Sequence, residues 1–307
     1  MKLPLVHAPR PSWPFPDHQG DFVAPQALAA FARASAALGR AFAALRASQW
    51  VHFALLPLAV TVAPTGRRVD APTLGLATLA AAGCLAYAYG LNAWADRLTD
   101  RCVVKNPLVG ARPSRLVTVV IAGSALLALS LGVLLGWTSL AAATTSLAFA
   151  TVYSVGPRLK AMPVLGTLAN GALFVPLLVL GSPAGEPLRV HPTLVFSFLV
   201  LLTQNQLAHE VADLAEDAAA AVTTTARWLG PTAARRCGFA LGALGACALL
   251  VGGGPLATVA AVVVLVGGLF ILNRRTADPA AVRRWHRWYA LASGAGLFLM
   301  ALGQAGS

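Results

Sequence analysis

The stretch Pro192–Asp217, PTLVFSFLVLLTQNQLAHEVADLAED, runs from a long apolar segment into a cluster of carboxylates. The acidic residues of this cluster are Glu210, Asp213, Glu216 and Asp217. A second stretch has the same plan: an apolar segment that begins near residue 72 ends in Asn92, Asp96 and Asp100. The two clusters hold six of the eleven acidic residues of the chain. Carboxylates are costly to place at the end of an apolar segment, so each cluster indicates a functional site.

The composition is typical of a membrane protein. The chain is 57% hydrophobic and 11% charged, with a mean hydropathy of +0.70, whereas about a quarter of the residues of a soluble domain are charged. Apolar segments of about 20 residues, the length that crosses a bilayer, recur without the alternation of a transmembrane barrel. We predict an all-α, polytopic membrane protein with nine transmembrane helices at residues 47–64, 72–95, 116–135, 138–155, 162–181, 192–213, 233–252, 255–273 and 286–304.

The segment before the first predicted crossing has a different character. Its first 25 residues hold six prolines and no continuous apolar core, which argues against a cleaved signal peptide. Residues 26–46 place apolar side chains at helical spacing and predict an amphipathic helix on the membrane surface; a solvated tail helix is the alternative. We therefore divide the chain into a cytoplasmic tail with a surface helix (1–46) and a transmembrane domain (47–307).

The net charge of +12 could indicate nucleic-acid binding, but the positions of the basic residues indicate membrane topology instead. With an inside amino terminus and nine crossings, 20 of the 23 Lys and Arg residues fall in inside segments, as the positive-inside rule expects. The helices at 72–95 and 192–213 then both run inward. This topology brings both acidic clusters to the cytoplasmic boundary of a bacterial-type inner membrane, and no nucleic-acid partner is expected.

The spacing within each cluster places its polar side chains on one helical face. Asn92, Asp96 and Asp100 are four residues apart, while Glu210, Asp213 and Asp217 are three and four apart. Glu216 lies off this face. Two facing rows of carboxylate and amide oxygens, with no Cys or His at ligand spacing, suit Mg²⁺ bridging a diphosphate. The alternative is that these are helix-end carboxylates neutralised by neighbouring basic residues.

Basic residues follow both the first cluster and the predicted helix at 138–155. Lys105 and Arg112 follow the first cluster, and Tyr153-Ser-Val-Gly-Pro-Arg158-Leu-Lys160 closes that helix on the inside. Guanidinium and ammonium groups next to a metal can hold phosphate oxygens. The alternative interpretation is that they only anchor the chain at the inner membrane surface.

These residues resemble the UbiA superfamily of intramembrane prenyltransferases. The family's first motif, Asn-Asp-x-x-Asp-x-x-x-Asp, is matched by Asn92, Asp96 and Asp100, with Ala93 in place of the first Asp. Its second motif, Asp-x-x-Asp-x-x-x-Asp, is matched by Glu210, Asp213 and Asp217, with Glu in place of Asp. Further segments that resemble family members are Gln49–Val51, Tyr153–Lys160 and Thr223–Gly230. The resemblance extends from the first predicted helix to the ninth.

The resemblance implies a central cavity within the nine-helix bundle and Mg²⁺-dependent transfer of a prenyl group from an isoprenoid diphosphate to a lipophilic acceptor, of which an aromatic one is favoured. By position, the metal or metal-water ligands would be Asn92, Asp96, Asp100, Glu210, Asp213 and Asp217. The catalytic set would be Asp96, Asp100, Asp213, Asp217 and Tyr153, the last lining the pocket near the allylic carbon. The diphosphate would contact Lys105, Arg158 and Lys160.

Two other functions remain compatible with the motifs or the composition. A terpene cyclase on the same scaffold would ionise the same diphosphate and use no acceptor, so products formed without acceptor would distinguish it. A cation or proton-coupled transporter would need polar residues through the whole bilayer, and the outer halves of the helices at 72–95 and 192–213 are almost wholly apolar. That pattern disfavours a transporter.

Three smaller patterns complete the sequence analysis. Gly238 and Gly242 form a small-residue face that predicts close helix packing. Three consecutive amides, Gln204–Gln206, lie inside a predicted helix, and we expect one of them to face the cavity. The four cysteines lack Cys-x-x-Cys spacing, so zinc and redox roles are not expected.

Overall fold

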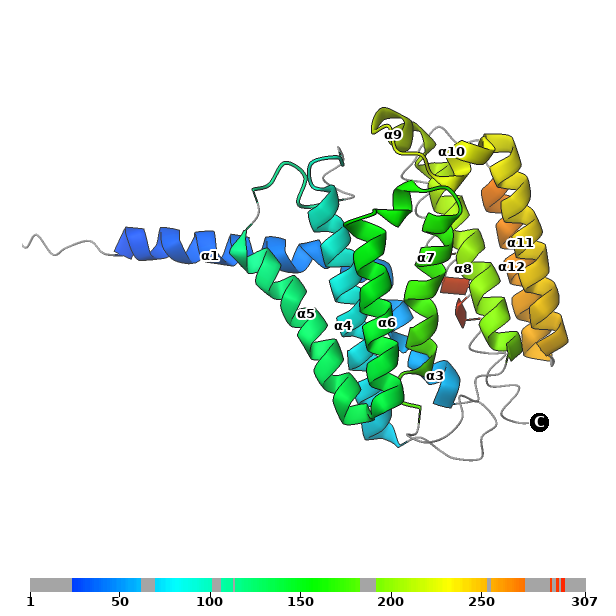
Figure 1. Cartoon of the computed structure of the whole chain (residues 1–307), viewed down its shortest axis with the longest axis horizontal. Coiled ribbons are helices and arrows are strands. Elements are labelled where there is room, and N and C mark those ends of the chain that lie inside the picture. Colours follow the sequence, from blue (N-terminus) through cyan, green and yellow to red (C-terminus); the bar gives the residue numbers. More distant parts are fainter. Residues whose placement is uncertain are drawn as a thin grey trace, which may run out of the picture. The chain divides into compact units, whose positions relative to one another are not determined.

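A computed structural model describes residues 24–61, 70–100, 106–112, 114–182, 192–252 and 255–273, with isolated positions between 288 and 295. The described part is helical and contains no strand (Figure 1). It divides into two compact units, Met1–Gly39 and Arg40–Ser307. The elements are α1 Ala24–Ala44, α2 Ala47–Trp50, η1 Val51–Leu55, α3 Leu56–Thr61, α4 Ala71–Asp96, α5 Arg115–Leu135, α6 Trp137–Ser154, η2 Leu159–Ala161, α7 Leu165–Phe174, η3 Val175–Val179, α8 Pro192–Ala212, α9 Leu214–Ala219, α10 Thr225–Leu229, α11 Pro231–Gly252 and α12 Pro255–Asn273.

The first eight predicted helices each have a helical counterpart among these elements. The ninth, 286–304, falls almost entirely outside the described residues. Within the described part, four helical stretches are long and apolar enough to cross a membrane: Leu28–Leu58, Ala71–Asp96, Arg115–Leu135 and Pro231–Val251. The all-helical class is therefore confirmed, while nine crossings and the division at residue 46 stay predictions.

Two predicted helices are less regular than expected, and proline explains both. The segment at 47–64 is α2, a 3-10 turn (η1) and α3, with Pro57 in the first turn of α3. The segment at 162–181 is α7 followed by a 3-10 turn (η3), which contains Pro176. Proline has no N–H to donate and its ring clashes with the carbonyl four residues earlier, so the α-helix before it tightens or ends.

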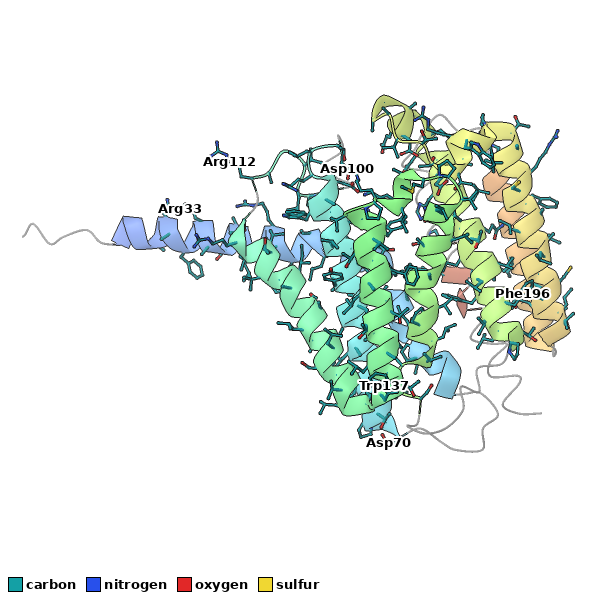
Figure 2. The ribbon with its side chains drawn as sticks, in the orientation of Figure 1. Arg33, Asp70, Asp100, Arg112, Trp137 and Phe196 are labelled. Atoms are coloured by element: carbon teal, nitrogen blue, oxygen red, sulfur yellow. The ribbon has the colours of Figure 1, made fainter. Side chains whose placement is uncertain are left out.

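Helix α4 is the central element of the second unit. The Asp70 carboxylate caps its start by accepting a hydrogen bond from the Thr73 N–H at 2.7 Å. Its neighbours are α5 and α6 (Figure 1). Gly83 lets α5 approach closely, because a Cβ there would stand 2.9 Å from the Ser124 carbonyl oxygen. Figure 2 shows Asp70 and Asp100 at opposite ends of this helix.

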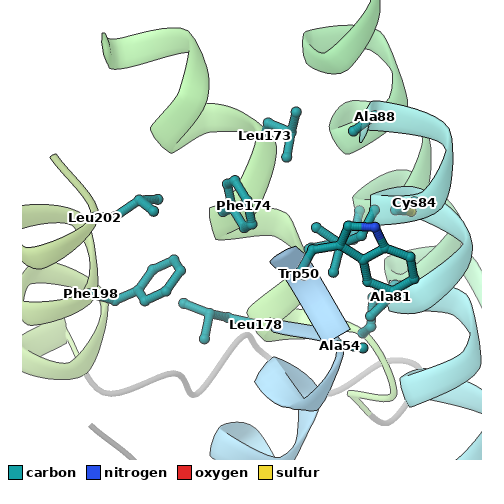
Figure 3. Packing of buried hydrophobic residues seen from close by; sticks show 14 of the residues in the cluster. Trp50, Ala54, Ala81, Cys84, Ala88, Leu173, Phe174, Leu178, Phe198 and Leu202 are labelled. Atoms are coloured by element: carbon teal, nitrogen blue, oxygen red, sulfur yellow. The ribbon is translucent and has the colours of Figure 1, made fainter. Parts of the chain in front are cut away.

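The largest apolar cluster lies among α4, α6, α7, η3 and α8. Small side chains on α4, such as Ala81 and Cys84, face the indole of Trp50, and Phe174 and Phe198 lie on the other side (Figure 3). The Trp50 indole N–H donates to the Leu45 carbonyl at 2.5 Å. This buried tryptophan fixes the start of the first predicted crossing against the bundle.

Helices α8 and α11 form another close pair (Figure 1). A Cβ at Gly242 would stand 2.4 Å from the Gln204 side-chain nitrogen, and one at Gly245 would stand 2.6 Å from Leu201. The prediction that Gly242 serves helix packing is therefore confirmed. Of the three consecutive amides, Gln204 is buried against α11, whereas Gln206 lines the cavity described next.

Candidate active site

A cavity of about 540 Å³ opens within the second unit, at the Asp100 end of α4. Its wall is formed by Arg46 and Gln49 at the start of α2, by α4 and the residues that follow it, and by α6, the α6–α7 loop, α7, α8 and the segment 213–224. Nine predicted site residues line this one cavity: Asn92, Asp96, Asp100, Tyr153, Arg158, Lys160, Glu210, Asp213 and Asp217. Arg112, which the sequence analysis also considered for phosphate binding, does not line it. Lys105 lies outside the described residues. The structure thus brings together the two acidic rows, which are more than a hundred residues apart in sequence.

The first acidic row is held by two cations from the α6–α7 loop. Arg158 Nη2 lies 3.1 Å from Asp96 Oδ1, and Lys160 Nζ bonds the other oxygen of the same carboxylate. Lys160 Nζ also donates to Asn92 Oδ1 at 2.8 Å. Burial lowers the pKa of the Lys160 ammonium, while the charge of Asp96 opposes that shift. These contacts compensate a carboxylate that stands at the negative end of the α4 dipole.

The α6–α7 loop has an unusual backbone that places these cations. Arg158 and Val164 have positive φ angles of 50° and 65°, a region that costs energy for residues other than glycine. A Cβ at Gly166 would stand 2.8 Å from the Leu159 carbonyl oxygen, so this glycine lets the loop fold onto the start of α7. The loop conformation is therefore what turns Arg158 and Lys160 toward α4.

Asn106 supports the end of the first row, and the sequence analysis did not identify it. Its side-chain nitrogen donates to the Ala93 carbonyl at 2.9 Å and to Asp100 Oδ2 at 3.0 Å. Its side-chain oxygen accepts from the Leu108 N–H at 3.0 Å. The residue is fully buried. Asn106 thus fixes the Asp100 carboxylate to the C-terminal end of α4.

The second acidic row begins with a carboxylate that is already hydrogen-bonded within the protein. Glu210 Oε2 accepts from the Ala226 N–H at 3.0 Å, and Oε1 accepts from Gln206 at 3.1 Å and from the Thr167 hydroxyl at 3.4 Å. Only 6% of Glu210 is exposed. The Thr167 hydroxyl also bonds that of Thr225 at 2.8 Å. Glu210 therefore ties α7, α8 and α10 together, in addition to lining the cavity.

The segment between Glu210 and Ala226 carries the rest of the row and is closed by further bonds. Asp217 Oδ2 accepts from the Thr224 hydroxyl at 3.2 Å. The Arg227 guanidinium donates to the Asp217 carbonyl at 3.1 Å and to the Val222 carbonyl. These bonds hold α9 and the following turn as one loop at the cavity wall. Asp213 stands at the start of this loop, directly after α8.

Tyr153 lies near the end of α6 and faces the second row. Its hydroxyl accepts a hydrogen bond from Gln206 at 3.5 Å, and Gln206 in turn bonds Glu210. The lining also includes apolar side chains, among them Ala88, Leu173 and Phe174. The cavity therefore combines a carboxylate-rich part with an apolar part.

The donor set fits a hard divalent cation, because the two rows offer carboxylate and amide oxygens with one histidine, His209, beside them. Within the described ranges, no three Asp, Glu, His or Cys side chains already converge on one point. Asp96 does not take part in such a cluster because both of its carboxylate oxygens already bond cations of the chain, Arg158 and Lys160. A metal ion would exchange with these contacts.

Comparison with solved structures identifies the fold. A UbiA homologue from Archaeoglobus fulgidus bound to GPP and Mg²⁺ is similar over 87% of this chain and 100% of its own, with a TM-score of 0.66 and 22% identity. A UbiA homologue from Aeropyrum pernix K1 is similar over 81% of this chain and 97% of its own, with a TM-score of 0.66 and 20% identity. A structure of digeranylgeranylglyceryl phosphate synthase in membranes is similar over 87% of this chain and 99% of its own chain, with a TM-score of 0.64 and 14% identity.

At these identities the structural matches show the fold alone. No curated protein sequence matches the chain significantly. The sequence model of the UbiA prenyltransferase family, however, matches residues 53–300, a region that contains both acidic rows and the α6–α7 loop between them. The chain therefore belongs to the UbiA prenyltransferase family.

Proposed function

We propose that this integral membrane protein transfers a prenyl group from an isoprenoid diphosphate to a lipophilic acceptor, in a reaction that depends on Mg²⁺. The observation that carries the proposal is the single cavity that holds both acidic rows together with Arg158 and Lys160. The A. fulgidus homologue, whose structure contains GPP and Mg²⁺, supports the same chemistry by analogy. An aromatic ring is the acceptor class we favour, because an electron-rich carbon can attack an allylic cation.

The two acidic rows and the cations of the α6–α7 loop have different tasks in this proposal. Asn92, Asp96 and Asp100 on one side, and Asp213 and Asp217 on the other, would hold the metal ions. Mg²⁺, when bound, neutralises the diphosphate and makes it a better leaving group. Lys160 and Arg158 would leave Asp96 and bond phosphate oxygens instead. Their positive charge would then stabilise the departing diphosphate.

The apolar part of the cavity serves the prenyl chain. Ala88, Leu173 and Phe174 line it and keep water away from the allylic carbon once the C–O bond breaks. Tyr153, oriented by its bond with Gln206, lines the same cavity, and its ring can face the developing positive charge. The acceptor then attacks the allylic carbon and loses a proton.

The test is the consumption of radiolabelled prenyl diphosphates of several chain lengths by purified protein in lipid nanodiscs, with a lipid extract as acceptor source. We expect Asp96→Asn to lower turnover by about 100-fold or more, since one cavity charge that acts in the transition state is removed. Asp70→Asn is the matched control: it makes the same change at the opposite end of α4. Full turnover by Asp96→Asn, or in excess EDTA, would overturn the proposal.

The same assay distinguishes the terpene cyclase. Product formed in nanodiscs without any acceptor would indicate cyclisation, whereas a requirement for the lipid extract indicates transfer. Orientation is tested separately by labelling Cys237, which is exposed near the cavity end of α11, from either side of inverted membrane vesicles. We propose that this end faces the cytoplasm of a bacterial-type inner membrane, because the positive-inside rule places its flanking basic residues there.

A further inference from the structure

Phe174 is the last residue of α7 and lines the cavity together with its neighbour Leu173 and with Ala88 of α4. Its side chain is almost fully enclosed, with 3% of the residue exposed. The Phe53 ring lies behind it at 4.8 Å, centre to centre. The acidic rows and the loop cations bind a diphosphate whatever chain it carries, so the length of the prenyl chain must be set by this apolar lining.

Helix α7 carries its lining residues away from the acidic rows. It starts shortly after the part of the α6–α7 loop whose cations bond Asp96. Thr167, in the first turn of α7, bonds Glu210 of the second row. Phe174 follows seven residues later, which is about 10 Å along the helix axis. The Phe174 ring therefore belongs to the end of the cavity that is remote from the carboxylates.

The main chain places the Phe174 ring firmly. The Val175 N–H still donates to the Gly171 carbonyl and closes the last turn of α7. Pro176 has no N–H with which to continue the α-helix, and the chain goes on as the 3-10 turn η3. Phe174 thus stands at the junction of two regular elements, and not on a loop that could swing aside.

The side chains around the Phe174 ring fall into two groups (Figure 3). On one side lie Leu173 and Ala88, which line the cavity. The residues around the rest of the ring are each at most 6% exposed and do not line the cavity: Trp50, Leu178, Phe198 and Leu202. Phe174 therefore separates the cavity from the packed apolar core. Within the described part of the chain, it is the floor of the cavity.

The distance to this floor can be compared with the length of a prenyl chain. Each isoprene unit adds four carbon–carbon bonds of about 1.5 Å, and so about 5 Å of extended chain. The distance of about 10 Å from Thr167 to Phe174 along α7 then holds about two units. A third unit would meet the Phe174 ring and the core behind it, and overpacking a dense core is destabilising.

We propose that Phe174 limits the prenyl donor to about two isoprene units, that is, to a ten-carbon allylic diphosphate. The inference rests on the proposed function and narrows its donor. Replacing the Phe174 ring by a methyl group should leave a cavity, because a packed core relaxes only partly around a truncated side chain. Such a cavity is apolar and can take up an apolar ligand. A third isoprene unit would fill it.

The test compares donors of ten, fifteen and twenty carbons with the purified chain in nanodiscs with Mg²⁺. Binding is measured with prenyl thiolodiphosphates, in which sulfur replaces the bridging oxygen and slows ionisation. Turnover is measured with the diphosphates and the lipid extract. We expect the parent chain to bind the ten-carbon analogue at least tenfold more tightly than the fifteen-carbon one. In Phe174→Ala this order should reverse, since burying five more apolar carbons strengthens binding by more than tenfold.

Phe198→Ala is the matched control. It makes the same change in the same apolar cluster, at a residue that is also 3% exposed but does not line the cavity. Both variants should lower the unfolding temperature, yet Phe198→Ala should keep the parent's order of donors. Phe174→Leu removes less volume and is the milder variant. It should bring the fifteen-carbon analogue closer to the ten-carbon one without reversing the order.

Three outcomes overturn the inference. The parent chain binds the ten-carbon analogue no more tightly than the fifteen-carbon one, both Phe174 variants keep the parent's ratio, or Phe198→Ala shifts the ratio as much as Phe174→Ala does. Equal binding of all lengths by the parent would mean that the prenyl chain leaves the cavity sideways, away from Phe174. The proposed function fails by a different result, namely no consumption of any of the three diphosphates with the lipid extract. Since analogue binding needs no turnover, the two failures are distinguishable.

Discussion

Replacing Glu210 tests how the second acidic row is positioned. In Glu210→Ala, the carboxylate that accepts from the Ala226 N–H at 3.0 Å and from the Gln206 amide at 3.1 Å is removed. The Thr167 hydroxyl also loses a weaker contact with this carboxylate, at 3.4 Å. In Glu210→Gln the side chain keeps its size, but its NH₂ group cannot accept a hydrogen bond. One of the two short bonds is then lost and two donors face each other.

The expected loss follows from the number and burial of these bonds. A hydrogen bond to a charged group contributes about 1.5–3 kcal/mol, and a buried donor left without an acceptor costs a similar amount. Glu210 is only 6% exposed, so water does not replace it readily. We expect the free energy of unfolding to fall by about 3–5 kcal/mol in Glu210→Ala and by about 1–3 kcal/mol in Glu210→Gln.

The assay combines thermal unfolding in nanodiscs with hydrogen–deuterium exchange of the peptide that contains α10. Exchange of α10 should speed up in both variants, because Glu210 Oε2 holds the Ala226 N–H. In Glu210→Gln the turnover should fall while the Mg²⁺ concentration for half-maximal turnover changes little, since Asp213 and Asp217 keep their carboxylates. Unchanged exchange of α10 together with a large rise in the Mg²⁺ requirement would refute this reasoning and make Glu210 a metal ligand, as its place in the motif predicts.

Three further predictions concern residues around the site and in the packing. Asn106→Asp replaces a donor by a carboxylate next to Asp100 and should cost about 1–3 kcal/mol of unfolding free energy, seen as a lower unfolding temperature. Gly242→Ala should destabilise by about 1–3 kcal/mol through overpacking, whereas Gly123→Ala, with open space around its Cβ in α5, should be neutral or slightly stabilising. The N-cap bond with the Thr73 backbone lowers the pKa of Asp70. The ionised Asp70 carboxylate therefore stabilises the fold above the ordinary carboxylate pKa, and this stabilisation is lost as the pH falls through the lowered pKa. Asp70→Asn should remove this acid dependence from the unfolding temperature.

The helices and the acidic rows could be predicted because both follow from local spacing. Apolar segments of membrane length are visible one at a time, and α4 begins and ends within one residue of the predicted helix. Side chains four residues apart share a face in any α-helix. The meeting of the two rows followed from the predicted topology, which gives both helices the same direction across the membrane.

The supporting contacts could not be predicted, because they join residues that are distant in sequence. Thr167 and Thr225 share a hydrogen bond across 58 positions, and neither has a spacing that marks it. The 3-10 turns were missed for a different reason: the apolar pattern continues through Pro57 and Pro176, and only the loss of a backbone donor interrupts the helix. Asn106 had one local signal, as a polar residue shortly after the first motif.

The departure of this chain from the family's first motif has a structural counterpart. Ala93 is 1% exposed and lies in an apolar cluster with Leu108, Val117 and Ile121, away from the row formed by its neighbours on the cavity face of α4. A carboxylate at this position would be buried among apolar side chains, at a high desolvation cost. The backbone carbonyl of Ala93 instead accepts a hydrogen bond from Asn106, which also holds Asp100. In this chain, position 93 therefore supports the acidic row through its backbone, while Asn92, Asp96 and Asp100 line the cavity.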